Sequence, residues 1–214
     1  MILVLKILVL EKIKMDTKEH TIILASGSPR RQQFFKEMEI PFIKKVIPVE
    51  ESFPSTLSGS AIAEHIVAQK ANAFKNIIKD NEIIITADTI VWHQNKCLGK
   101  PTSIQNAEEI LKTLSDDTHQ VITAVGFLQK KTWECINVVS EVTFGPVSKK
   151  AIQEYIATGS PMDKAGAYGI QDLFGTLYID SISGSYTNII GLPVPHVYKK
   201  LREIIKINHL KKSS

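Results

Sequence analysis

The sequence predicts an α/β fold in which helices pack against a sheet of mixed strands. Apolar runs of strand length alternate with segments whose apolar residues recur at helical spacing. The chain has 214 residues, which is enough for one sizeable domain or for two small lobes that share a core. Hydrophobic residues make up 43% and charged residues 22%, a composition typical of globular proteins.

The first expected unit is a strand, a turn and a helix. "TIILAS" (21–26) is an apolar run bounded by a turn signal, which indicates a buried strand. Ser28 is then expected to cap a helix whose first residue is Pro29, since both residue types favour these positions. "PFIKKVIPV" (41–49) predicts a second strand, and apolar residues at helical spacing predict a helix over 60–79.

The middle of the chain predicts further strands around one helix. "EIIITA" (82–87) reads as a buried strand that ends at Asp88, and a short hairpin follows around Gln94–Asn95. A helix is expected from Ser103 to Leu114. The remaining expected elements are long strands over 119–129 and 133–144, a helix over 148–157, a loop over 158–175, a strand over 176–183, a turn over 183–193 and a helix from about Pro195 to Ile207.

Residues 1–14 are an N-terminal segment with an apolar start, and they allow two interpretations. "MILVLKILVL" is too short to span a bilayer, and charged residues follow it where a signal peptide would have a small-residue cleavage site. Because Met15 lies just before the first strand, we interpret 1–14 as an extension from an upstream start. A short amphipathic stretch docked on the fold is the alternative. Residues 15–210 are expected to form a single domain and 211–214 a basic tail.

Charge and cysteine usage exclude several classes of function. The formal net charge of +4 is mild and suits an anionic ligand, but the chain has no basic stripe or recognisable nucleic-acid-binding motif. We therefore expect no stable nucleic-acid partner and no membrane association. The only cysteines, Cys97 and Cys135, are far apart and in no CxxC pattern, which predicts a cytoplasmic protein without disulfides or a thiolate zinc site.

Two adjacent arginines, Arg30 and Arg31, stand at the start of the first expected helix. Cations are unfavourable there because the helix dipole is already positive at its N-terminus. Either the arginines point into water, or an anion binds among them, Ser28 and the free backbone N–H groups. The residues alone leave both interpretations open.

Other polar residues follow the expected strands. Asp88 comes directly after an apolar run, where a carboxylate can hold Mg²⁺ or activate water, although it can equally cap a turn. Glu51, paired with Glu50 after the second expected strand, suits a solvated surface as well as a metal site. Lys100 lies in a Gly-Lys-Pro turn from which it can reach a phosphate, and Lys70 in mid-helix is typical of a surface lysine.

Taken in order, these segments resemble the Maf family of nucleoside-triphosphate pyrophosphatases. The blocks are "ASGSPRR", "EES", "AQKA", "ADTIV", "LGKP", "DKAGAYGIQ" and "GSYTNIIGLP", and the resemblance covers about residues 21 to 205. It implies a mixed twisted sheet in two lobes around a central cleft, related to inosine-triphosphate pyrophosphatases. It also implies release of pyrophosphate with a divalent cation, Mg²⁺ or Mn²⁺, as cofactor, and it is compatible with a homodimer.

The resemblance also assigns expected roles to single residues. Asp88 matches the catalytic base, and Glu51 matches an acidic residue of the metal or water site, so these two are the expected metal ligands. The matched phosphate-binding cations are Arg31, Lys70 and Lys100. The positions associated with choosing the base are Arg30, Thr89 and Gln171.

The stretch "AGAYGIQ" resembles the subgroup that hydrolyses dTTP and UTP. The amide of Gln171 offers a donor and an acceptor suited to a pyrimidine edge. Asp172 follows where the family usually has glycine, which is expected to alter the backbone of the loop that carries Gln171. A 7-methyl-GTP pyrophosphatase of the same family and a non-hydrolysing nucleotide-binding regulator of cell division are the alternatives.

Overall fold

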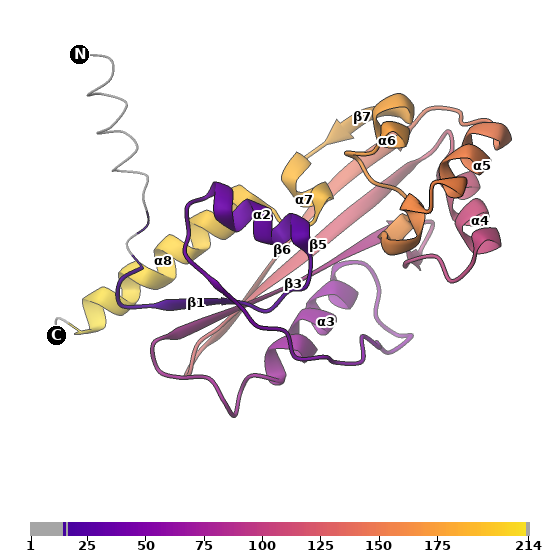
Figure 1. The fold of residues 1–214 in the computed structure, drawn as a ribbon. Coiled ribbons are helices and arrows are strands. Elements are labelled where there is room, and N and C mark those ends of the chain that lie inside the picture. The colour runs from indigo at the N-terminus through magenta and orange to yellow at the C-terminus, as the bar shows by residue number, and fades with distance from the viewer. Residues whose placement is uncertain (1–14, 16, 213–214) are drawn as a thin grey trace, which may run out of the picture.

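The computed structural model describes Met15 and residues 17–212, and these are built around one mixed sheet (Figure 1). The expectations for residues 1–14 lie outside the described residues. The strand order is β2-β1-β3-β5-β6-β7, and β4 pairs with β3 off this path. The strands are β1 (Thr21–Leu24), β2 (Ile43–Lys44), β3 (Glu82–His93), β4 (Lys96–Leu98), β5 (Thr118–Leu128), β6 (Trp133–Phe144) and β7 (Ile179–Ser183).

Strand β1 pairs in parallel with β2 and β3, and the other pairings are antiparallel. The helices are α2 (Pro29–Glu37), α3 (Ser60–Asn72), α4 (Ile104–Leu114), α5 (Lys149–Ala157), α6 (Leu173–Tyr178), α7 (Tyr186–Ile190) and α8 (Val194–Lys212), with 3₁₀ helices η1 (Ser160–Asp163) and η2 (Ala165–Ala167). The α/β class is therefore confirmed. None of the helices in this described part is long and apolar enough to cross a membrane.

The first lobe surrounds the β1 end of the sheet. Helices α2 and α8 cover one face, where Phe35 and Leu201 pack with the strand residues Ile85 and Phe127. Helix α3 covers the other face and buries Val67 against β3 and β5. Figure 1 shows α2 and α8 on one side of the strands and α3 on the other.

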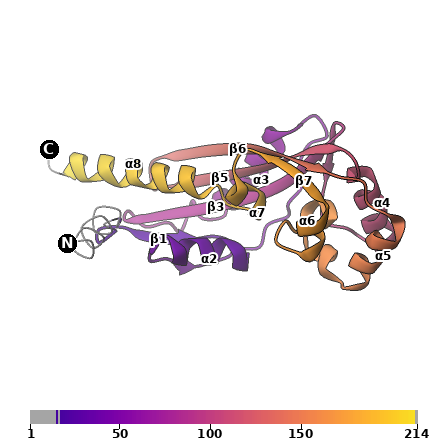
Figure 2. The ribbon, with the colours of Figure 1, turned by 90° about the horizontal axis from the view of Figure 1, so that it is seen from above.

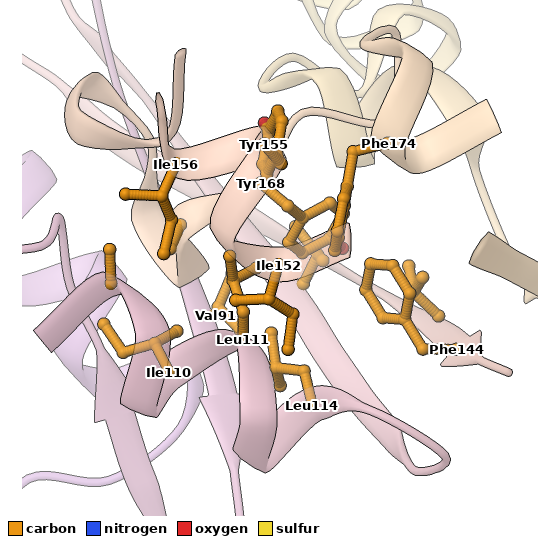
Figure 3. Close-up of a cluster of buried hydrophobic side chains, with 14 of the residues drawn as sticks. Val91, Ile110, Leu111, Leu114, Phe144, Ile152, Tyr155, Ile156, Tyr168 and Phe174 are labelled. Atoms are coloured by element: carbon orange, nitrogen blue, oxygen red, sulfur yellow. The ribbon is translucent and has the colours of Figure 1, made fainter. Parts of the chain in front are cut away.

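The second lobe lies at the opposite end of an elongated molecule (Figure 2). Helices α4 and α5 pack there on β5 and β6 and on the loop that leads to β7. Their core gathers aliphatic side chains such as Leu111 and Ile152 beside a group of aromatic rings, as Figure 3 shows. The aromatic members of this core are Phe144, Tyr155, Tyr168 and Phe174. Two lobes sharing one sheet agree with the expected architecture.

Strand β3 differs from its prediction in a way that shapes the cleft. It continues through Asp88 to His93, so Asp88 lies within the strand and not beyond its end. The reason is tertiary, because β5 pairs with β3 over Ile84 to Trp92. On the other edge, pairing with β1 stops at Ile85 and pairing with β4 begins at Val91. The edge of β3 between these points is open to the cleft.

The local signals for turns and caps are confirmed. Ser28 and Ser103 cap α2 and α4, accepting hydrogen bonds from the N–H groups of Arg31 and Asn106. The hairpin between β3 and β4 turns at Gln94 and Asn95, whose φ angles of 46° and 61° are both positive. That backbone is the one that two-residue hairpin turns require.

Three predicted elements are shorter than expected. The strand over 41–49 is reduced to Ile43–Lys44, because prolines at both ends of that stretch cannot donate to a ladder. The helix over 60–79 ends at Asn72, after which the chain continues in turns bonded from Phe74 N–H to the Ala71 carbonyl. The strand over 176–183 begins only at Ile179.

Helices occupy parts of the chain that were expected to be irregular. Helix α6 (Leu173–Tyr178) takes the end of the expected loop and the first three residues of the strand expected over 176–183, and α7 forms inside the predicted turn with Ser185 as its cap. The last helix starts at Val194 and continues past Ile207 to Lys212, into the stretch expected as a tail.

Candidate active site

A cleft of about 710 Å³ lies between the two lobes, along the open edge of β3. Its walls come from the start of α2, the segment after β2, α3, β3, the loop after β4 and the loop between η1 and α6. Every residue that the sequence singled out for a site role lines it. These residues are Ser28, Arg30, Arg31, Glu51, Lys70, Asp88, Thr89, Lys100 and Gln171.

Lys70 and Asp88 meet at the floor of this cleft. The ammonium nitrogen of Lys70 lies 2.8 Å from Oδ1 of Asp88 and 2.9 Å from Oε1 of Glu51. The side chains of Lys70 and Asp88 are 15% and 13% exposed, whereas that of Glu51 is 54% exposed. The hydroxyl of Thr86 donates to the carbonyl of Val67 at 3.1 Å, which holds α3 against this face of β3. The acidic pair therefore already has a positive charge between its oxygens.

Arg31 is held by hydrogen bonds to four residues from three parts of the chain. Its Nε donates to the Gly191 carbonyl at 2.8 Å, and Nη1 donates to the Ala87 carbonyl at 2.9 Å and to Ser26 Oγ at 3.3 Å. Nη2 donates to Thr89 Oγ1 at 3.0 Å. Burial lowers the pKa of Arg31, and the nearby Asp88 carboxylate opposes that shift. All but one of the guanidinium hydrogens are engaged, so Arg31 joins the walls of the cleft.

Arg30 and Lys100 are placed differently from Arg31. Both are exposed, both line the cleft, and neither makes a hydrogen bond or ion pair with another described residue. Among the described cations that line the cleft, these two are the ones whose side chains remain available to an anionic ligand. Of these two neighbours, Arg30 has a side chain that is free to bind, whereas the side chain of Arg31 is held by the fold.

The polar residues expected near a base are also divided. Thr89 lines the cleft, but its hydroxyl already accepts from Arg31 and is hydrogen-bonded to Thr123 Oγ1 at 2.9 Å. Gln171 is exposed in the loop before α6 and lines the same cleft. Of these two side chains, the amide of Gln171 is the one free to contact a ligand.

Several cleft residues were not singled out by the sequence. Lys164 stands in a quoted block but received no role, and it lines the cleft with its ammonium 2.6 Å from the Ser160 carbonyl. Tyr168 also lines the cleft, with its hydroxyl bonded to Nε2 of the buried His119 at 2.7 Å. Burial raises the pKa of the Cys97 thiol to about 11, so this cleft cysteine is protonated at neutral pH.

The acidic pair suits a hard divalent cation. Glu51 and Asp88 offer carboxylate oxygens on both sides of a positive charge, the ammonium of Lys70. Among the described residues no group of three or more His, Cys, Asp or Glu side chains is arranged to hold a metal. Mg²⁺ is commonly bound by one or two carboxylates, with waters and substrate phosphates completing its shell. The residues present therefore fit a cation that is bound together with a phosphate ligand.

Comparison with known proteins gives matches over most of the chain. A family model described as "Maf-like protein" matches residues 21–204. The dTTP/UTP pyrophosphatase of Flavobacterium johnsoniae is 46% identical over 193 residues, covering 90% of this chain and 100% of that protein. The dTTP/UTP pyrophosphatase of Bacteroides fragilis is 42% identical over 186 residues, covering 86% of this chain and 96% of that protein.

One solved structure gives a weaker match. The Ham1 protein of Staphylococcus aureus superposes with a TM-score of 0.43 at 16% identity, covering 58% of this chain and 71% of that one.

Proposed function

The chain belongs to the Maf family, and from that premise we propose that it hydrolyses dTTP and UTP to the nucleoside monophosphate and pyrophosphate. Relatives named for this activity align with the chain over nearly their whole length. The observation that carries the proposal is a single cleft that combines the Asp88, Glu51 and Lys70 cluster with the unpaired cations Arg30 and Lys100.

The free cations suit a triphosphate. Arg30 stands in the first turn of α2, where the backbone N–H groups near Ser28 also favour an anion. Lys100 approaches the same cleft from the loop after β4. Charge-assisted bonds from these groups would hold the β- and γ-phosphates and stabilise the leaving pyrophosphate.

The acidic cluster suits the hydrolytic step. Asp88 would accept a proton from a water whose oxygen attacks the α-phosphorus, while the bond from that phosphorus to the bridging oxygen breaks and pyrophosphate leaves. A Mg²⁺ or Mn²⁺ ion bound at Glu51 and Asp88 would neutralise charge on the phosphate oxygens. Lys70 would then turn from the carboxylates to the substrate phosphates.

Base choice would come from the second lobe. The exposed amide of Gln171 would bond the polar edge of uracil or thymine, which offers both a donor and an acceptor. Discrimination would require the bound base to cover this amide, since a wrong base would then leave it unpaired and shut off from water. It stays a prediction that Arg30 and Thr89 take part in base choice. The same holds for a cytoplasmic location, a homodimer and the lack of nucleic-acid partners.

A panel of nucleotides tests this proposal. Pyrophosphate release would be measured from dTTP, UTP, CTP, GTP and 7-methyl-GTP, with Mg²⁺ or Mn²⁺ and after chelation. We expect fast, metal-dependent turnover of dTTP and UTP. Preference for 7-methyl-GTP would support the proposed reaction but contradict the proposed substrates. If the folded protein turns over none of these nucleotides, the proposal of an enzyme is contradicted and the non-hydrolysing nucleotide-binding regulator is favoured.

A further inference from the structure

The geometry points to Tyr155 and Asp172 as a clamp that positions Gln171 and thereby sets the base selectivity of the cleft. This inference rests on the proposed function. Tyr155 belongs to α5, outside every motif that the sequence offered, and Asp172 directly follows Gln171. Neither residue is proposed to react, so both would act through the loop that carries Gln171.

One hydroxyl bonds the chain on both sides of Gln171. The hydroxyl of Tyr155 donates to Oδ2 of Asp172 at 2.5 Å and accepts from the backbone N–H of Gly169 at 3.2 Å. The ring of Tyr155 stacks on Phe174 with 4.4 Å between centroids and an interplanar angle of 14°. Since Tyr155 is only 8% exposed and sits in the core of the second lobe, it is a fixed anchor (Figure 3).

The Asp172 carboxylate does not cap the helix that begins after it. Asp172 is the N-cap of α6, where an aspartate commonly accepts from the first N–H groups of the helix, yet it makes no such bond. Its Oδ2 instead accepts from Ser160 Oγ at 2.8 Å and lies 3.7 Å from the Lys164 ammonium. The carboxylate therefore ties the loop to α5 and η1.

The tie closes a tight turn. The N–H of Asp172 donates to the Gly169 carbonyl at 3.1 Å, which leaves Ile170 and Gln171 as the central residues. A Cβ on Gly169 would lie 2.8 Å from the Asp172 carboxylate, and one on Gly175 would lie 2.4 Å from the Gly169 carbonyl oxygen. With so little room, the backbone of Gln171 has one arrangement while the clamp is intact.

A fixed turn matters because glutamine alone reads pyrimidines poorly. The amide has a donor on one side and an acceptor on the other, so a free side chain can rotate to match either uracil or cytosine. Holding the backbone fixes the point from which the side chain extends, so fewer of its rotamers bring the amide within hydrogen-bonding distance of the base. The clamp would thus favour UTP over CTP without touching either nucleotide.

Two substitutions, one that removes the hydroxyl of Tyr155 and one that removes the charge of Asp172, test the clamp. Tyr155→Phe keeps the ring stack, Asp172→Asn keeps the shape, and Tyr178→Phe is the control, since Tyr178 also packs on Phe174 but not on Asp172. For each variant, kcat and KM would be measured with UTP and CTP. We expect KM for UTP to rise about tenfold, the UTP to CTP selectivity to fall about tenfold and kcat to stay within about threefold. Tyr178→Phe should keep the wild-type ratio.

The double variant and hydrogen exchange separate positioning from simple structural support. If the two residues act as one unit, Tyr155→Phe with Asp172→Asn should lose no more selectivity than the worse single variant. Exchange should quicken in 169–178 and stay unchanged in β5. An equal loss of kcat/KM for UTP and CTP, or unchanged exchange in 169–178, would overturn the clamp. Absence of turnover in the wild type would instead overturn the proposed function, while the exchange experiment would still report on the clamp.

Discussion

Lys70 donates to Asp88 across 2.8 Å, and the same ammonium lies 2.9 Å from Glu51. The single charge of this ammonium thus offsets one of the two carboxylate charges of the proposed cation site. A divalent cation would have to displace this ammonium before it could bind both oxygens. Lys70 would therefore weaken the binding of a divalent cation, and its ammonium would bind a substrate phosphate once it is displaced.

Lys70→Met should tighten metal binding and slow turnover. Without the ammonium, Mn²⁺ alone should bind about tenfold more tightly, because the carboxylates no longer have an internal partner. The value of kcat/KM for UTP should fall by about tenfold to a hundredfold, because a phosphate loses a charge-assisted bond. Mn²⁺ titration followed by calorimetry and steady-state kinetics measure the two effects. Lys75→Met, at an exposed position outside the cleft, is the control, and unchanged Mn²⁺ affinity in Lys70→Met would refute the competition.

Arg31→Lys and Arg30→Gln should have opposite phenotypes. Lysine cannot reproduce the forked bonds to Ala87 and Gly191, so Arg31→Lys should lower the free energy of unfolding by about 2 to 3 kcal/mol. Arg30→Gln should change it by less than about 0.5 kcal/mol and raise KM for UTP about tenfold. Urea denaturation and steady-state kinetics on both variants check this, and equal stability losses would contradict the division of roles.

His119→Gln should flatten the acid side of the stability profile. Burial, followed by the nearby His93, lowers the pKa of His119 to about 3, while Asp117 opposes the shift. Between pH 6.5 and that value the unfolded chain takes up a proton that the folded chain refuses, so stability falls with falling pH. The slope from this one group is at most about 1.4 kcal/mol per pH unit. Glutamine keeps an acceptor for the Tyr168 hydroxyl but does not titrate.

Urea unfolding of wild type and His119→Gln between pH 6.5 and 4.5 measures this difference. Carboxylates and the other histidines also titrate in this window, but both proteins carry them, so the difference between the two profiles reports His119. Parallel profiles for the two proteins would show that His119 gains a proton equally in the folded and unfolded states.

Local sequence signals predicted much of the fold but not the connections that build the cleft. Ser28 and Ser103 could be identified as caps because a cap depends on residues within one helical turn. Arg31 could not be distinguished from Arg30, since its partner Gly191 is 160 residues away in the chain. The length of β3 was missed for the same reason, because distant β5 extends it beyond Asp88.

The candidate site shows the same pattern. Motifs placed every expected residue on one cleft, because each block brings a polar side chain to the open edge of β3. Tyr155 belongs to no motif and reads as an ordinary core aromatic of α5. Only the fold shows that its hydroxyl meets both Gly169 and Asp172. Which residues lie in the cleft was predictable, whereas which of them are free to bind was not.

The most direct test of the account is the rate of pyrophosphate release from UTP by Asp88→Asn with saturating Mg²⁺. Asparagine keeps the shape and can still accept from Lys70, so the fold and nucleotide binding should be preserved. Asp116→Asn, at an exposed position off the cleft, is the matched control. We predict that kcat falls about 10²–10⁴-fold in Asp88→Asn, while its affinity for a non-hydrolysable UTP analogue stays within about threefold. A kcat close to that of the wild type would contradict the assignment of Asp88 as the base.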